Sequence, residues 1–219
     1  MKKFLKVIKK SPLFGGVTDD EILSMLGCLS AESRAYKKNE FIYRVGERVS
    51  SVGMVLSGSV HIIKEDFWGN RSILKEAGEG RLFGETYACA QNVPLGVSVL
   101  APERAVILFL DVKRILTVCS SACVFHTRLI RNLLFVLAEE NLALTGKIGH
   151  MTQRTTREKL LSFLSAESQK KGSNTFNIAF NRQQLADYLS VDRSAMSSEL
   201  CRLRDEGVLE FSKNSFKLK

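Results

Sequence analysis

The side chains with the clearest chemistry lie close to the C-terminus. Arg193, Ser194, Ser197 and Ser198 share the outer side of a predicted helix. The apolar residues of the same helix lie on the other side: Met196, Leu200 and Leu203. Short polar side chains with an arginine, on the exposed face of a helix that opens from a tight turn, suit insertion into the major groove of double-stranded DNA.

The neighbouring residues predict the elements that hold this helix. Asn181 can cap a first helix over 182–189, and 190–192 forms the turn, with Asp192 as cap of the second helix. Gly207 ends that helix, and two alternating segments follow, 208–212 and 215–218. This order is typical of a winged helix-turn-helix. The alternative is a small helical subdomain that contacts no DNA.

Composition agrees with a polyanionic partner. The chain has 219 residues, a formal net charge of +9 and a pI of about 9.4. From His150 onward there are 12 Lys and Arg against 8 Asp and Glu, so about half of the excess lies earlier in the chain. Five irregularly placed cysteines favour reduced thiols in the cytoplasm. No apolar run has the length of a membrane span, and the opening MKKFLKVIKK does not have the pattern of a secretory signal.

Motifs of enzymes and cofactor sites are missing. The sequence has no GxSxG, no P-loop and no HExxH, so we expect neither enzymatic activity nor a cofactor. Cys119 and Cys123 are four residues apart, close to His126. Three residues on one helix are a poor tetrahedral set for zinc, so inert thiols are the favoured interpretation and a redox role is the alternative.

Two further regions precede the C-terminal domain. Residues 120–148 read as one long helix whose apolar positions keep a near-heptad spacing: Ile130, Leu133, Leu137 and Leu144. Self-pairing of this helix would form a homodimer, and the alternative is packing within its own chain. Residues 34–110 contain short β-rich runs separated by turns, at which Gly46, Gly53 and Gly58 are expected to lie. The prediction is an α+β chain with an N-terminal β-roll and dimerisation helix over 1–148 and a winged helix-turn-helix over 149–219.

Together these segments resemble the CRP/FNR family of bacterial transcription regulators, nearly end to end. The resemblance is carried by SPLF at 11–14, DDEI at 19–22, YRVGE at 43–47, VLSGSV at 55–60, FGE at 83–85 and the helix-turn-helix over 182–203. It implies a cyclic-nucleotide-binding-like domain, a homodimer on palindromic promoter sites and contact with RNA polymerase. The alternative is a ligand-sensing β-roll whose tail mediates protein contacts.

The chain departs from the cyclic-AMP-binding members of that family. Gly84 and Glu85 match the pair that holds the ribose, but Leu95 and Gly96 stand where those members have an arginine and a hydroxyl for the cyclic phosphate. A phosphate facing leucine would lose its charge-assisted hydrogen bonds, so cyclic AMP is not the expected effector. The resemblance then implies an apolar pocket for another small molecule, with these candidate residues: Phe83, Gly84, Glu85, Tyr87, Leu95, Gly96, Val97 and Leu142. Two alternatives are that Glu85 is a structural acceptor and that side chains fill the pocket.

The resemblance also assigns DNA contacts. Arg193 is the expected guanine contact, while Ser194 and Ser198 replace the glutamate and arginine of many relatives, so we expect a different half-site. Ser197 adds a further base contact. Arg182, Gln183 and, on the wing, Lys213 are the expected phosphate contacts.

Overall fold

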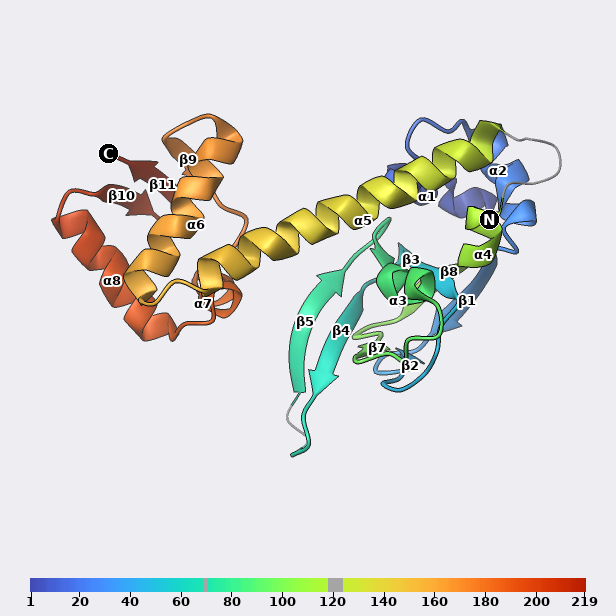
Figure 1. Cartoon of the computed structure of the whole chain (residues 1–219), viewed down its shortest axis with the longest axis horizontal. Helices are drawn as coiled ribbons and strands as arrows, with labels where there is room; N and C mark the ends of the chain where they lie inside the picture. The colour runs from blue at the N-terminus through green and yellow to red at the C-terminus, as the bar shows by residue number, and fades with distance from the viewer. Residues whose placement is uncertain (69–70, 118–123) are drawn as a thin grey trace. The chain divides into compact units, whose positions relative to one another are not determined.

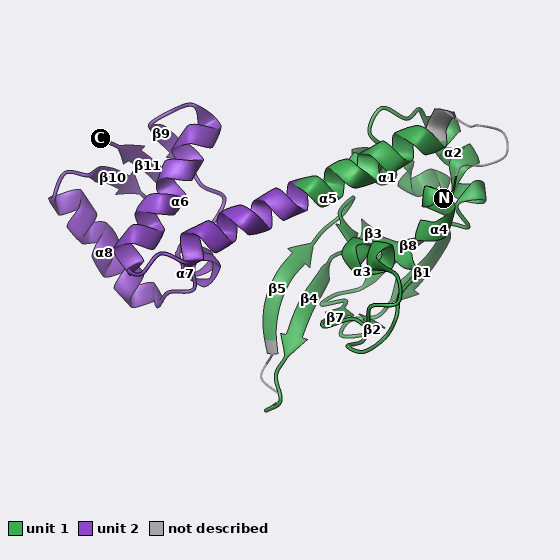
Figure 2. Cartoon of the chain, in the orientation of Figure 1, with its two compact units in different colours: residues 1–138 green, residues 139–219 purple. Residues whose placement is uncertain are grey.

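The computed structural model describes residues 1–68, 71–117 and 124–219. The chain forms two compact units, Met1–Ala138 and Glu139–Lys219, coloured separately in Figure 2. The division falls inside the long helix α5 (Val124–Met151). Cys119 and Cys123, with their suggested redox role, lie outside the described residues.

Unit 1 is a β-roll of two four-stranded antiparallel sheets, preceded by helices (Figure 1). The first sheet has the order β1 (Glu32–Tyr36), β8 (Ala105–Asp111), β3 (Ser51–Ser57), β6 (Leu82–Phe83). The second has the order β2 (Phe41–Tyr43), β7 (Ser98–Leu100), β4 (Val60–Glu65), β5 (Arg71–Ala77). The helices of this unit, besides α5, are η1 (Lys2–Phe4), α1 (Leu5–Lys10), η2 (Pro12–Phe14), α2 (Asp19–Cys28), α3 (Glu85–Ala90) and α4 (Val112–Leu116). The predicted α+β class is confirmed.

The central strands are apolar on both faces because they separate two cores. In β8, Leu108 and Leu110 pack into a cluster with α2 and α5, whereas Ile107 and Phe109 face the interior of the roll. Successive strand side chains point to opposite faces, so a strand buried on both faces appears in the sequence as a continuous apolar run. This is why AVILFLD is a run and does not alternate.

Gly53 does not lie in a turn, which corrects that expectation. It is paired with Phe83 in the middle of β3, and a Cβ at this position would lie 2.2 Å from Cζ of that ring. The glycine is required because the Phe83 ring packs directly over its backbone. Gly46 and Gly58 do lie in turns, with φ of +86° and +78°.

One side of the first half of α5 packs against the other elements of unit 1. Leu129 and Leu133 belong to its core, and Asn132 Nδ2 donates to the carbonyls of Leu13 (2.9 Å) and Gly15 (3.0 Å). Leu133 is only 1% exposed in the single chain, so it has no surface left for a partner. This corrects its assignment to the dimer seam. Ile130 and Leu137 are half-buried, and Leu144 is exposed.

Unit 2 contains three further helices and a three-stranded antiparallel sheet. The helices are α6 (Thr156–Lys171), α7 (Arg182–Leu189) and α8 (Arg193–Asp205). The sheet has the order β10 (Leu209–Ser212), β11 (Ser215–Leu218), β9 (Thr175–Asn177). Leu185, Leu189, Met196, Leu200 and Leu203 are fully buried in one core, as their helical spacing predicts.

Candidate nucleic-acid interface and effector pocket

The turn between α7 and α8 is fixed by local hydrogen bonds. Asn181 and Gln184 form a reciprocal capping box at the start of α7, and Ser190, the C-cap that follows the helix, has φ of +51°. Asp192 Oδ1 accepts a hydrogen bond from the backbone N–H of Ala195 (2.8 Å) and so begins α8. These caps satisfy N–H groups that a helix start leaves without partners. The angle at which α8 leaves the turn is therefore set by the sequence.

The outer face of α8 is polar and open. Arg193, Ser194 and Ser198 are exposed, on the side away from the buried Met196 and Leu200. The predicted base contacts are thus brought together on one helix. Ser197 differs from the others, because it is half-buried and its hydroxyl donates to the Arg193 carbonyl (2.9 Å). It retains only acceptor capacity toward a ligand.

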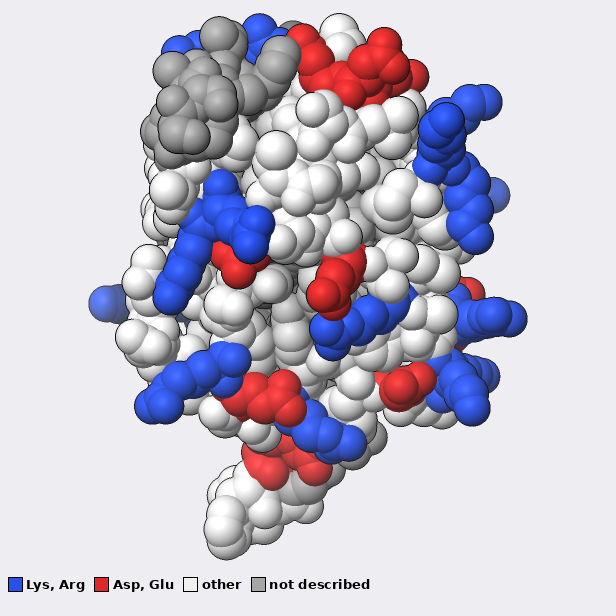
Figure 3. Space-filling view, turned by 90° about the vertical axis from the view of Figure 1, so that its right-hand side faces the viewer, with Lys and Arg blue, Asp and Glu red and all other residues white. Residues whose placement is uncertain are grey.

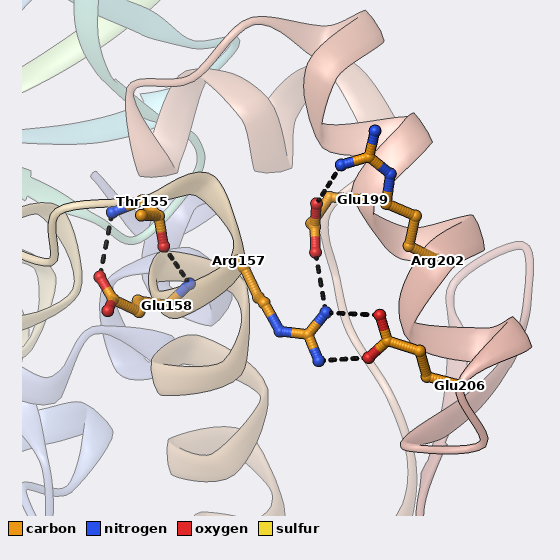
Figure 4. Close-up of polar contacts among 6 residues, drawn as sticks. All are labelled: Thr155, Arg157, Glu158, Glu199, Arg202 and Glu206. Atoms are coloured by element: carbon orange, nitrogen blue, oxygen red, sulfur yellow. Dashed lines mark hydrogen bonds and ion pairs between the residues drawn. The ribbon is translucent and has the colours of Figure 1, made fainter.

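Arg157, which was not predicted as a site residue, ties α6 to α8 (Figure 4). Its guanidinium makes a two-point ion pair with Glu206 and a further contact with Glu199, at 3.2 Å. The hydrogen bonds that Arg157 donates to Glu206 raise the pKa of Arg157 and lower the pKa of Glu206. The capping box of Thr155 and Glu158 starts α6 just before this arginine. A single arginine in the first turn of a helix carries no sequence signal that would have identified this contact.

The predicted phosphate contacts are in different environments. The Arg182 guanidinium lies over the rings of Phe211 (4.9 Å) and Phe216 (5.1 Å), and burial lowers its pKa. It therefore stabilises the wing as well as presenting charge. Gln183 is exposed and donates to Asp187 Oδ1 (2.8 Å). Lys213 is exposed in the two-residue turn between β10 and β11.

The predicted effector residues of the β-roll lie in the tight turn at Gly84 and in the loop 95–97, in which Leu95 is buried. Gly84 has φ of +74° and precedes α3, whose first residue, Glu85, is buried. Phe83 is in the roll core, and the ring of Tyr43 lies edge-on to it at 6.0 Å. The Phe83 side chain thus occupies part of the roll interior.

The loop from Leu95 to Val97 is held by hydrogen bonds to the segment at Gly46 and Glu47 and to Tyr87 of α3. Leu95 is 2% exposed, and its backbone N–H and carbonyl bond to Glu47 and Gly46. The backbone N–H of Gly96 donates to the Tyr87 hydroxyl (3.3 Å). Val97 is half-buried, and Leu142 is an exposed residue of α5 in unit 2. Leu95, which the resemblance places where cyclic-AMP-binding members have an arginine, is thus a buried apolar side chain.

Charge is mixed on the face shown in Figure 3, where Lys and Arg are spread among Asp and Glu. The excess positive charge does not form one continuous patch on that face. Among residues 1–68, 71–117 and 124–219, no group of three or more His, Cys, Asp or Glu is arranged to hold a metal ion. In the same ranges, no helix is both long and apolar enough to cross a bilayer.

Two family models match the chain, one in each unit. The cyclic nucleotide-binding domain matches residues 33–122, and the Crp-like helix-turn-helix domain matches residues 158–219. Together the two matched ranges cover most of the chain. The chain belongs to the CRP/FNR family of transcription regulators, in which a domain of the first kind is followed by a helix-turn-helix of the second.

Solved structures of similar fold support the same architecture. The catabolite activator protein of Thermus thermophilus is 22% identical, with a TM-score of 0.51, and the match covers 95% of this chain and 94% of that one. CLP of Xanthomonas campestris, described as c-di-GMP responsive, is 19% identical with a TM-score of 0.57, covering 90% and 97%. A CooA variant of Carboxydothermus hydrogenoformans is 20% identical with a TM-score of 0.59, covering 92% and 93%.

Proposed function

We propose that this chain is a sequence-specific, homodimeric regulator of transcription that binds palindromic promoter sites in the cytoplasm and has no enzymatic activity. The observation that carries the proposal is α8, whose inner face is fully buried while Arg193, Ser194 and Ser198 stand exposed. A helix held by a capped turn, with short hydrogen-bonding groups on its free side, fits the major groove of B-DNA.

The division of DNA contacts follows from the local geometry. Arg193 is the residue for a bidentate contact to guanine, and the exposed hydroxyls of Ser194 and Ser198 make direct or water-mediated contacts. Ser197 contributes less, because its proton is already donated to the Arg193 carbonyl. Gln183, Lys213 and the charge of Arg182 hold the phosphate backbone, which sets affinity without reading sequence.

Dimerisation is proposed to use the exposed face of α5. Leu134, Phe135 and Leu142 are each more than half exposed in the single chain. Their spacing places them on one side of an α-helix, with Ala138 between them, away from the buried Leu133. Ile130, Leu137 and Leu144 flank this face. A two-fold axis along it would set two copies of α8 about one DNA turn apart, ~34 Å.

The dimer is tested by changing one residue of this face. Leu142→Glu should give a monomer in analytical ultracentrifugation at concentrations where the unchanged chain is a dimer, because a charge in an apolar seam is costly. Ala143→Glu, which adds the same charge at an exposed residue of the same helix outside this face, is the matched control. A Leu142→Glu variant that stays dimeric would exclude this face.

The β-roll is proposed to sense a small molecule other than cyclic AMP. The buried Leu95 supports this, because it supplies neither charge nor hydrogen bonds to a cyclic phosphate. Signalling to RNA polymerase is the expected output of a regulator of this class. A second candidate function, in which unit 2 binds a protein instead of DNA, is favoured by no contact that the structure describes in residues 139–219.

Salt dependence separates the two functions. Counterion release makes the logarithm of DNA affinity fall linearly with the logarithm of salt concentration, with a slope set by the number of neutralised phosphates. We expect a steep slope for the unchanged chain and a smaller one for Lys213→Gln. A folded protein whose DNA affinity is independent of salt would reject DNA binding as its function.

A further inference from the structure

A cavity of about 360 Å³ opens in the β-roll beside β1 and β2. None of its lining residues is among the predicted effector residues. Three aromatic rings line it, those of Tyr36, Tyr43 and Phe109. Phe109 lies edge-on to Tyr36 at 6.4 Å and tilted to Tyr43 at 5.9 Å, so the three rings form one continuous aromatic surface. Its volume is within the range of small-molecule sites, ~300–1,000 Å³.

The residues that line this cavity carry a net negative charge, whereas the whole chain is positively charged. Three carboxylates line it, those of Glu32, Glu47 and Asp111, against two guanidiniums, those of Arg34 and Arg48. The chain as a whole carries +9. The local excess of one negative charge favours a cationic occupant.

The existing contacts show which charges remain for a ligand. Glu32 and Arg34 neutralise each other at 2.8 Å. Arg48 Nε donates to the Asn92 carbonyl at 3.1 Å. Glu47 and Asp111 each use one carboxylate oxygen to accept a backbone N–H, at 3.1 Å in both cases. The second oxygen of each carboxylate is therefore available to an incoming donor.

We propose that this cavity is a binding site for a small organic cation with an aromatic body, an arylalkylamine. The Arg34 guanidinium already lies over the Phe109 ring, 5.5 Å from its centroid. The aromatic body therefore packs against Tyr36 and Tyr43, and the ammonium group lies against the Tyr43 face and donates to Glu47. Aromatic faces attract cations through the ring quadrupole, and a nearby carboxylate adds a charge-assisted hydrogen bond.

Tyr43 connects the cavity to the turn that precedes α3. Its hydroxyl donates to the Ser51 carbonyl at 3.0 Å, and its ring packs on Phe83. A Cβ at Gly84 would lie 3.3 Å from the same ring. A ligand that shifts Tyr43 thus acts directly on Phe83 and Gly84. Every residue that forms the site is in unit 1, so ligand binding at this site does not require that unit 2 binds DNA.

The test is titration calorimetry of the full chain with phenethylamine, with phenylacetate as a probe of similar size and opposite charge. We expect phenethylamine to bind with a stoichiometry of one per chain and phenylacetate to bind at least about tenfold more weakly. Binding of phenylacetate as tightly as phenethylamine would overturn the assigned charge. Absence of phenethylamine binding to folded chain would overturn the site.

Variants locate the binding. Glu47→Gln should weaken phenethylamine by about threefold or more, as expected for loss of a partly exposed ion pair. Tyr36→Leu, which removes a half-buried ring, should weaken it by a similar factor. Glu79→Gln makes the same charge change at an exposed residue outside the cavity and should leave affinity unchanged. Equal affinities in the Glu47 and Glu79 variants, each with an unchanged circular dichroism spectrum, would contradict the proposal.

Discussion

Arg157 of α6 and Glu206 at the end of α8 form a two-point ion pair, with Nη1–Oε1 of 3.0 Å and Nη2–Oε2 of 2.5 Å (Figure 4). Arg157 Nη1 also contacts Glu199, which lies two turns earlier on the same helix. The planar guanidinium thus fixes both the position and the rotation of α8 relative to α6. Arg157 is therefore a positioning residue for α8, the helix proposed to read DNA.

Replacing Arg157 by lysine keeps the charge but removes the two-point geometry. We expect Arg157→Lys to lower the thermal midpoint of unit 2 and to weaken binding to a specific site more than to random DNA. Arg202→Lys is the control, since Arg202 meets the same Glu199 by a single contact of 3.6 Å and is mostly exposed. Equal effects of the two substitutions in calorimetry and in DNA binding would contradict the positioning role.

Arg193 and Arg182 should have separable effects on DNA binding. Arg193→Ala should relax specificity at one base pair, at a loss of about 1–3 kcal/mol for the cognate base. Arg182 should be changed to methionine, because alanine would also remove the packing on Phe211 and Phe216. Arg182→Met should weaken all sequences similarly and reduce the salt slope. Competition binding with cognate and random DNA measures the loss of affinity of each variant for each DNA. Equal losses on the two DNAs for both variants would show that Arg193 does not contribute specificity.

Gly53→Ala should destabilise unit 1, because the added Cβ would lie 2.2 Å from the Phe83 ring and Phe83 is a rigid core side chain. Overpacking of this kind costs about 1–3 kcal/mol. Phe83→Leu should cost stability alone but should relieve the clash in the double variant. Urea unfolding of the four proteins gives the coupling energy. Strictly additive losses would show that the two residues do not share this space.

Local chemistry made most of the C-terminal domain predictable. Asn181, Asp192 and Gly207 mark helix ends by residue type alone, and the structure has α7 at the predicted residues. The β-roll was predictable as a class because turns recur along it. The prediction that Gly53 lies in a turn is wrong. Before the strand pairing is known, a glycine that lies beneath an aromatic ring in a strand cannot be distinguished from a turn glycine.

Contacts between distant segments could not be predicted. Leu133 and Leu134 are adjacent and equally apolar, and only the packing of α5 on unit 1 decides that the first is buried and the second exposed. The Arg157–Glu206 pair joins residues 49 apart in the sequence. The aromatic cavity is lined by residues of β1, β2 and β8, and β8 lies far from the other two strands in the sequence.

His150 should make the stability of unit 2 depend on pH. Burial lowers its pKa below the ordinary 6.5, against the raising effect of Glu167, and its Nδ1 lies 2.8 Å from Ser162 Oγ. The unfolded chain then binds more protons than the folded one as pH falls through that value, so stability decreases on acidification. His150→Gln should flatten the decrease in urea midpoint between about pH 7.5 and about pH 5.5. His61→Gln in unit 1 is the control, and identical pH profiles for the unchanged chain and the His150 variant would refute the effect.

Selection from a random double-stranded DNA pool tests whether the chain reads a palindromic DNA site as a dimer. The purified, reduced chain is used without added ligand and with added phenethylamine. We predict enrichment of an inverted repeat with half-site centres about one helical turn apart in at least one of these conditions. An Arg193→Ala selection should lose preference at one position of each half-site. Failure of the folded chain to enrich any sequence in either condition would contradict sequence-specific DNA binding by this chain.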